Sequence, residues 1–235
     1  MPFDFMNNRV YMVDYSKIFN EIMGQRVLSN KDIQAQYLIQ WLNVLRQHDD
    51  ILIKQFSTKQ AIMEYIIKVQ SEPEIFQLPI HWKTDTLFLH FRVSIANEIC
   101  KEYSSQNQRI PIAEFQGDSQ CIYWTKVEEN VKRYAGNNQP IIAVPYFSGK
   151  YNLLVIDGNH RLTYSVIHNK EDIKTLIISE KSVIEQQIFS SSFDMMLYIF
   201  NNELVRFGNK TAEEKDNDLE LIQKSYLCGK GFQID

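Results

Sequence analysis

The chain has 235 residues, of which 44% are hydrophobic and 23% are charged, and it includes 14 phenylalanines and 12 tyrosines. This composition is typical of a globular protein with a sizeable core and excludes an intrinsically disordered one. The formal net charge of −4 argues against strong nonspecific binding to DNA or RNA, because such binding rests on lysine and arginine side chains that neutralise phosphates.

The cysteines and the hydropathy of the sequence predict the cellular compartment of the protein. Cys100, Cys121 and Cys228 lie far apart and form no CxxC pair, so neither a disulfide framework nor a zinc ribbon is predicted. The histidines include no HxxxH pair, and no metal site is predicted from them. The first residues lack a basic flank followed by an apolar core, and no run of about 18 apolar residues occurs. We therefore expect a cytoplasmic protein without a membrane span.

Residues 1–105 are predicted to be mostly helical. Ser29 and Asp32 have the spacing of a capping box, and apolar residues then recur at helical intervals. Ser57 and Gln60 repeat this device before a second helix that ends near a proline.

A third helix is predicted over 84–103, because apolar residues recur there every four positions. These residues are Leu87, Phe91, Ile95 and Ile99. The polar stretch EYSSQNQR follows at 102–109, and short apolar runs begin immediately after it. We place a boundary here, which divides the chain into a helical region, a core and a helical extension: 1–105, 106–180 and 181–235.

The predicted core has the order strand, helix, strand, strand, turn, helix, strand, which makes it an α/β (α+β) fold. Its strands are IPIAEF at 110–115, PIIAVPYF at 140–147, YNLLVI at 151–156 and IKTLIIS at 173–179. Its helices are placed at 123–134 and at about 160–168. The second and third strands are predicted to form a hairpin.

The predicted extension contains one long helix with an apolar face at 193–207, which we interpret as a core face, with Gly208 just past its end. The acidic stretch at 211–220 is expected to be solvated. A last short helix is predicted at 219–226.

The turn VIDGNHRL at 155–162 is the candidate site. Gly158 permits a tight bend after a strand, and the first amides of the following helix attract anions. Arg161 is available for bidentate phosphate contact, and His160 adds a donor. Asp157 would repel an anion unless it holds a cation, a hydroxyl or a neighbouring arginine. It is therefore a candidate for magnesium binding, for proton transfer or for holding the turn.

Together with its flanking elements, this turn resembles a known family. The strands, helix and order over 108–180 are similar to those of the ParB-like domain superfamily, which includes sulfiredoxin and the free-serine kinases. The sequence VIDGNHRLTYSV is similar to the DGxHR and DGxQR signatures of ParB-like and restriction-associated proteins. The resemblance implies a ParB/sulfiredoxin-like mixed-sheet core.

The resemblance also implies a ligand. In that family the turn binds the phosphates of ATP, ADP or CTP, which implies phosphate contacts from Gly158, Asn159, His160 and Arg161. Glu114, at the end of the first predicted strand, matches an acidic residue near the active site of some relatives. Sulfiredoxin carries a nucleophilic cysteine at the position of Asn159, so reduction of a sulfinic acid is not expected. Leu162 follows the arginine where chromosome-partitioning proteins carry a second arginine, so segregation is not expected either.

The leading hypothesis is a nucleotide-binding protein. As an enzyme it would catalyse phosphoryl transfer or nucleotide hydrolysis, with Arg161 stabilising charge, His160 orienting a phosphate, and Asp157 or Glu114 acting as base or Mg²⁺ ligand. The first alternative is a noncatalytic module that binds a protein partner. The second is a nuclease or an accessory protein of DNA modification. The small-molecule acceptor or protein partner is not identified by the sequence.

Overall fold

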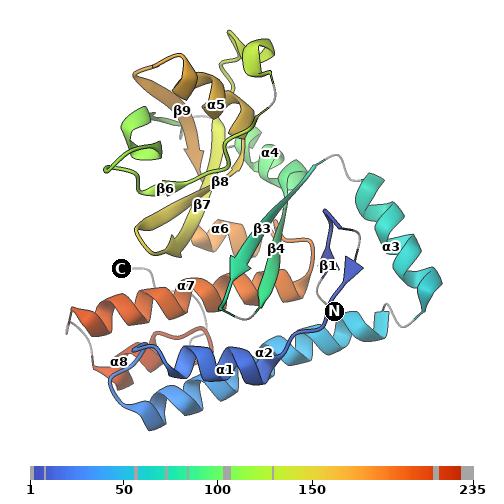
Figure 1. Cartoon of the computed structure of the whole chain (residues 1–235), viewed down its shortest axis with the longest axis vertical. Coiled ribbons are helices and arrows are strands. Elements are labelled where there is room, and N and C mark those ends of the chain that lie inside the picture. The colour runs from blue at the N-terminus through green and yellow to red at the C-terminus, as the bar shows by residue number, and fades with distance from the viewer. Residues whose placement is uncertain are drawn as a thin grey trace. The chain divides into compact units, whose positions relative to one another are not determined.

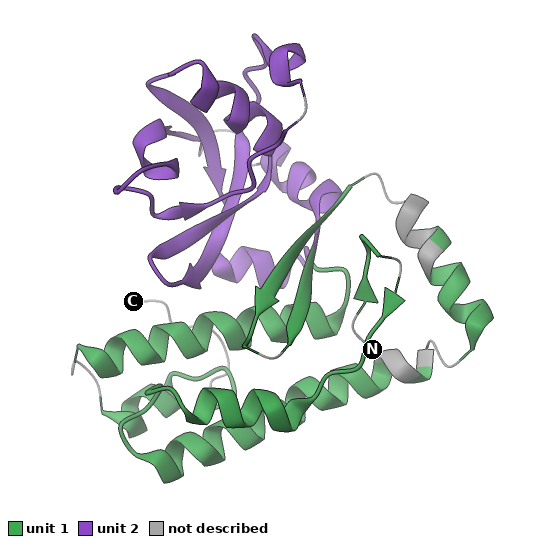
Figure 2. Ribbon diagram, viewed as in Figure 1, with its two compact units in different colours: residues 1–90, 189–235 green, residues 91–188 purple. Residues whose placement is uncertain are grey.

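The computed structural model describes residues 3–7, 9–55, 58–71, 74–83, 85–102, 107–128, 130–213 and 217–228. The chain forms two compact units, one of residues 1–90 with 189–235 and the other of residues 91–188 (Figure 2). Both ends of the chain therefore contribute to the first unit. Helices and strands occur in both units, which confirms the mixed α/β class.

A mixed five-stranded sheet lies at the centre of the unit 91–188 (Figure 1). Its strands are β5 (Gln108–Pro111), β6 (Ile122–Tyr123), β7 (Ile141–Ser148), β8 (Tyr151–Asp157) and β9 (Asp172–Ile177). They lie in the order β5-β9-β7-β8-β6, in which β7 and β8 are antiparallel and β9 runs parallel to β7. The predicted hairpin and last strand are confirmed.

Short helices accompany this sheet. They are α4 (Val93–Glu102), the 3₁₀ helices η2 (Ile112–Phe115) and η3 (Val131–Tyr134), α5 (Asn159–Ile167) and α6 (Glu180–Glu185). α5 packs against β7 and β9, and its Leu162 is fully buried in a cluster with Ile141 and Val155. The apolar residue after Arg161 therefore anchors the helix that was predicted at 160–168.

The helix predicted over 84–103 is wrong in its first half, where β4 (Thr86–Arg92) precedes α4. A spacing of four residues keeps side chains on one face of a strand as well as of a helix, because four is a multiple of the strand repeat. Leu89 lies midway between Leu87 and Phe91, and all three are buried. Burial of the middle residue distinguishes a strand from a helix here.

The helix predicted over 123–134 is also wrong. Residues 124–128 have no regular secondary structure, and only η3 follows them. The amides of Thr125 and Val127 donate to side chains of α5 at 3.0 and 3.1 Å. In an α-helix that begins at Tyr123, the amide of Val127 would instead donate to the carbonyl of Tyr123.

The other unit, of residues 1–90 with 189–235, contains two small sheets, each of two strands. The strands are β1 (Phe3–Asp4), β2 (Arg9–Val10), β3 (Ile75–His81) and β4. The helices are α1 (Tyr15–Met23), α2 (Lys31–Gln55), α3 (Lys59–Ser71), α7 (Ser192–Ala212) and α8 (Asp218–Gln223). α2 packs against both α1 and α7. No helix within the described residues is long and apolar enough to cross a membrane.

Several predicted helix ends shift. Asn30, and not Ser29, begins α2, because its Oδ1 accepts from the amide of Ile33 at 3.2 Å. Ser57 lies outside the described residues. The predicted C-terminal helix continues through Gly208 to the end of α7. A glycine inside a long, buried helix costs only about 1 kcal/mol relative to alanine, so packing decides where the helix ends.

Glu203 of α7 is a carboxylate that is only 5% exposed. Its Oε1 accepts from the Tyr37 hydroxyl and the Trp41 indole, both at 2.8 Å, and from Ser225 Oγ at 2.6 Å. Its Oε2 accepts from the Tyr226 amide at 2.8 Å. Hydrogen bonds to a charged acceptor are the strong ones. Glu203 therefore joins α2, α7 and the segment after α8.

We expect Glu203→Ala to lower the free energy of unfolding by about 3 kcal/mol or more, because buried donors would lose their acceptor. Urea denaturation of the full chain measures this value. Glu64→Ala, which changes an exposed residue of α3, is the matched control and should stay within about 0.5 kcal/mol. Equal effects of the two substitutions would contradict the role given to Glu203.

Candidate functional site

α5 begins directly after β8 because Gly158 turns the chain within one residue. Its φ of 91° lies in the left-handed region, which side chains disfavour. A Cβ atom at this position would lie 2.5 Å from Cγ2 of Ile141 and 2.8 Å from Nη2 of Arg161. Both the conformation and the space therefore require glycine.

Asp157 and Arg161 form an ion pair across the turn, with Oδ2 and Nη2 3.0 Å apart and side chains 12% and 14% exposed. The same Nη2 donates to the carbonyl of Pro140 at 3.1 Å. Nε of Arg161 is buried and has no hydrogen-bond partner among the described residues. Of the roles expected for Asp157, the contact with a neighbouring arginine is the one present. Its roles as a base or magnesium ligand stay predictions.

The first turn of α5 has no side-chain cap, since Gly158 is the N-cap residue. Other helices of the chain begin with a side-chain oxygen that accepts from a first-turn amide, namely those of Asp14, Ser179, Ser191 and Asn217. The first amides of an uncapped helix point outward, and the helix dipole favours an anion there. α5 therefore begins without a side-chain acceptor from its N-cap residue, as expected of an anion-attracting turn.

The side chain of Asn159 is directed to the protein and not to a ligand. Its Oδ1 accepts from the amide of Thr125 at 3.0 Å, and Oγ1 of Thr163 accepts from the amide of Val127 at 3.1 Å. These two bonds fasten residues 124–128 to α5. Asn159 can meet a phosphate through its backbone amide alone.

His160 stacks on Tyr134 of η3, with ring centroids 5.1 Å apart and an interplanar angle of 30°. The guanidinium of Arg133 also lies over the Tyr134 ring, 5.1 Å from its centroid. The first turn of α5 and η3 are therefore in contact, and Tyr134 links the turn to the cavity described next.

A cavity of about 860 Å³ lies beside α5, at the upper end of the range usual for small-molecule sites. Arg161, Tyr164 and Ser165 line it from one face of α5. Its other lining residues come from β5, from β9 and the residues before it, and from Tyr134 and residues 136–139. Arg161 thus belongs both to the uncapped first turn and to the cavity.

Basic side chains outnumber acidic ones in the lining. The basic residues are Arg109, Arg161, Lys170 and Lys174, and the acidic ones are Glu171 and Asp172. Arg109 is paired with Asp172, whereas Lys170 and Lys174 have no ion pair within the described residues. The wall at 136–139 supplies side-chain amides. The cavity can therefore hold an anionic ligand with several hydrogen-bonding groups.

The charges of Asp157 and Arg161 also affect the pKa of the Cys100 thiol, which belongs to α4. Burial raises the pKa of its thiol, and the negative charge of Asp157 raises it further, while Arg161 and Lys174 oppose this effect. The thiol form is favoured, so Cys100 is not a nucleophile activated by the turn.

Glu114 is not among the residues that line the cavity. The strand predicted over 110–115 ends at Pro111, and η2 carries Glu114 instead. There Cys121 Sγ donates to Glu114 Oε2 over 3.7 Å. Burial, followed by the nearby Glu114 carboxylate, raises the pKa of Cys121. A catalytic role for Glu114 stays a prediction.

In the parts of the chain that the structure describes, no three His, Cys, Asp or Glu side chains gather as a metal site.

Sequence reasoning missed the basic side chains contributed by the sheet. Arg109 of β5 and Lys174 of β9 are paired positions of an antiparallel ladder, so they share one face. A lysine inside the otherwise mostly apolar strand IKTLIIS was a signal that Lys174 faces away from the core. Its pairing with β5, more than 60 residues earlier in the chain, was not visible.

We expect Gly158→Ala to lower the free energy of unfolding by more than about 2 kcal/mol, because a left-handed conformation and a steric overlap act together. Gly149→Ala is the matched control: its φ is 57°, but a Cβ atom there meets nothing within 4 Å. The control should cost about 1 kcal/mol from conformation alone. Denaturation curves of the two variants measure the losses. Equal losses would show that Ile141 moves aside at no free-energy cost, which would contradict the steric requirement for glycine.

Comparisons of the chain with models of protein families, with curated proteins and with solved structures each found no match. The function of the chain is therefore inferred from the geometry of the turn and cavity and from the resemblance of the DGNHR turn.

Proposed function

We propose that the chain binds a nucleotide, with its phosphates at the turn 157–161 of a ParB/sulfiredoxin-like core and its nucleoside in the adjoining cavity. The observation that carries the proposal is the position of Arg161, which lies in the uncapped first turn of α5 and also lines the cavity. A phosphate there would meet backbone donors and a guanidinium together.

The charges near the turn support a phosphate ligand. Asp157 holds Nη2 of Arg161, which fixes the guanidinium before any ligand arrives and reduces the ordering cost of binding. Lys170 and Lys174 add positive charge to the cavity. The phosphate contacts are assigned to the backbone of Gly158 and Asn159, to His160 and to Arg161.

The lining of the cavity supports a ligand larger than inorganic phosphate. Tyr134 and Tyr164 offer aromatic faces, and Asn137, Asn138 and Gln139 offer amide donors and acceptors. Stacking on aromatic rings and hydrogen bonds from amides are the usual means of holding a nucleobase. ATP, ADP and CTP, with or without Mg²⁺, are the ligands proposed.

Binding without turnover is favoured over catalysis. Asp157 is engaged with Arg161, and Glu114 is engaged with Cys121, so each proposed general base already has a partner. The proposed role of Asp157 is to position the arginine. Phosphoryl transfer would need this carboxylate to leave its ion pair.

We expect ATP, ADP or CTP with Mg²⁺ to raise the melting temperature of the full chain, since a ligand at 100 times its Kd stabilises by about 2.7 kcal/mol. Arg161→Ala should abolish the rise, and Arg161→Lys should keep only part of it, because lysine lacks the bidentate fork. Lys181→Ala changes an exposed side chain of α6 and should leave the rise intact. Differential scanning fluorimetry measures all four proteins.

Each variant is compared with itself in the absence of ligand, because Arg161→Ala leaves Asp157 unpaired and lowers stability by itself. No rise with any nucleotide in the unsubstituted chain would overturn the proposal. A rise that survives in Arg161→Ala would place the nucleotide elsewhere. Release of inorganic phosphate at a rate above that of Arg161→Ala would contradict binding without turnover.

A further inference from the structure

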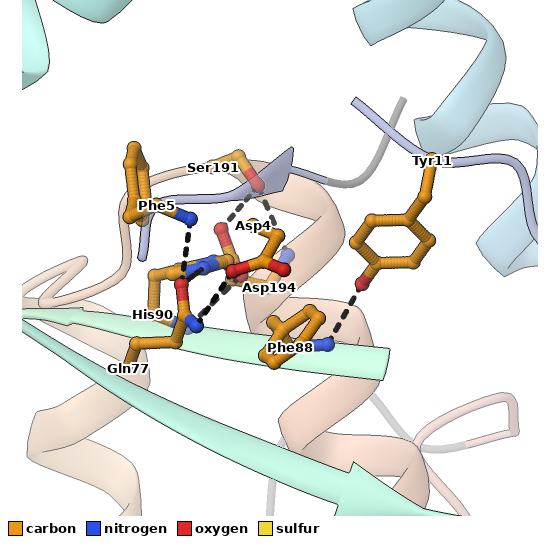
Figure 3. Close-up of polar contacts among 8 residues, drawn as sticks. All are labelled: Asp4, Phe5, Tyr11, Gln77, Phe88, His90, Ser191 and Asp194. Atoms are coloured by element: carbon orange, nitrogen blue, oxygen red, sulfur yellow. Dashed lines mark hydrogen bonds and ion pairs between the residues drawn. The ribbon is translucent and has the colours of Figure 1, made fainter. Parts of the chain in front are cut away.

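A buried polar network joins β1, β3, β4 and α7 (Figure 3). At its centre is His90, which is 3% exposed. Its Nδ1 lies 2.7 Å from Oδ1 of Asp194, and its Nε2 lies 3.1 Å from Oε1 of Gln77. Both ring nitrogens therefore face oxygen atoms.

The side-chain amide of Gln77 is fixed in orientation by two independent contacts. Its Oε1 accepts from the backbone amide of Phe5 at 2.8 Å, which requires an oxygen at that position. Its Nε2 donates to Oδ1 of Asp4 at 3.2 Å, which requires a donor. The atom opposite Nε2 of His90 is consequently an oxygen, and Nε2 must carry a proton to bond with it.

The opposite ring nitrogen faces a carboxylate that already accepts from other donors. Oδ1 of Asp194 accepts from the backbone amide of His90 at 3.0 Å, and its Oδ2 accepts from the hydroxyl of Ser191. An Asp194 carboxylate with these donors is an acceptor toward Nδ1. A hydrogen bond at Nδ1 then requires a second proton on the ring.

We propose that His90 is a buried imidazolium, doubly donating to Asp194 and Gln77, and that it fastens the amino-terminal residues 3–7 in a proton-dependent manner. The chain of contacts runs from the ring through Gln77 to the Phe5 amide and to Asp4. The proton on Nε2 is the one lost as the pH rises, because the bond from Nδ1 to a carboxylate is the stronger one. A nitrogen lone pair would then face the lone pair of Gln77 Oε1, which breaks the first bond of that chain.

The charged and titratable groups around the His90 ring form two acid–base pairs. Asp194 of α7 opposes His90, and Arg9 of β2 opposes Asp4 of β1 at 3.2 Å. Burial raises the pKa of Asp4, but hydrogen bonds from Asn7, Gln77 and Arg9 outweigh it and hold the pKa below its usual value. Asp4 therefore remains an acceptor for Gln77.

Phe5 and Tyr11 of the same unit are further neighbours in this network (Figure 3). The edge-on ring of Phe5 lies 4.4 Å from the imidazole centroid. Tyr11 accepts from the Phe88 amide at 2.7 Å, and burial raises the pKa of its hydroxyl far above its usual value. Tyr11 stays neutral, so it does not compete with Asp194 for the ring.

This arrangement differs from a Ser-His-Asp catalytic relay, in which the serine hydroxyl lies at the imidazole nitrogen opposite the aspartate. Here the hydroxyl of Ser191 donates to Asp194, and Gln77 occupies the other side of His90. The network therefore serves attachment of a segment and not nucleophilic chemistry.

Nitrogen-15 NMR of the labelled full chain at about pH 7 tests the charge state, because imidazolium and neutral imidazole nitrogens have distinct shifts. We expect both ring nitrogens of His90 to carry protons. In the Asp194→Asn variant a neutral amide replaces the carboxylate, and only one ring nitrogen of His90 should carry a proton. Asp14→Asn, at the exposed cap of α1, is the matched control and should leave the His90 signals unchanged. A single protonated nitrogen in the unsubstituted chain would overturn the proposal.

Hydrogen exchange of the Phe5 amide tests the fastening, because this amide bonds to Gln77. As the pH rises and the ring loses its second proton, its protection factor should fall by about tenfold, the effect of losing one hydrogen bond. The Val27 amide is the internal control, since it bonds to the side-chain oxygen of Gln34 at 3.1 Å in the same unit. Its protection should stay constant. A Phe5 protection factor that does not change with pH would contradict the proton-dependent fastening.

Discussion

The candidate site depends on the absence of a side chain at Gly158. Because nothing projects from this residue, Ile141 of β7 and the guanidinium of Arg161 close over the turn, and α5 starts at the end of β8. Leu162 then enters the core, while Arg161 stays in the ion pair with Asp157. Any larger residue would separate the helix from the sheet and move the arginine. One missing methyl group thus sets the position of the charge on which the proposed function rests.

The two units differ in how completely their buried polar side chains are hydrogen-bonded. Asp194 faces His90, and Glu203 accepts from Tyr37, so each of these carboxyl groups has hydrogen-bond partners within the protein. At the turn the balance is incomplete: Arg161 keeps a buried Nε without a partner among the described residues, and α5 lacks a side-chain cap. An uncapped helix start favours an anion, and the adjoining cavity, which Arg161 also lines, carries more basic than acidic side chains.

Local patterns predicted the elements that local interactions decide. The hairpin at 140–156, the glycine turn and the strand at 173–179 follow from alternation and turn chemistry, and the structure contains them. Two errors have physical causes. A four-residue repeat fits strand and helix equally well, which hid β4. The amides of Thr125 and Val127 bond to side chains more than 30 residues away, and no local pattern shows this. The basic cavity wall required knowledge of which strands pair, and the His90 network required contacts between residues as distant in sequence as Asp4, Gln77 and Asp194.

The most direct test of the central claim is an NMR titration of the full chain with MgADP, observed at the backbone amides. We expect the amides of Asn159 and Arg161, in the uncapped first turn of α5, to shift most, and the amides of β9 around Lys174 to shift less. Shifts confined to other parts of the chain, or no saturable shift at the turn, would contradict a phosphate site at residues 157–161.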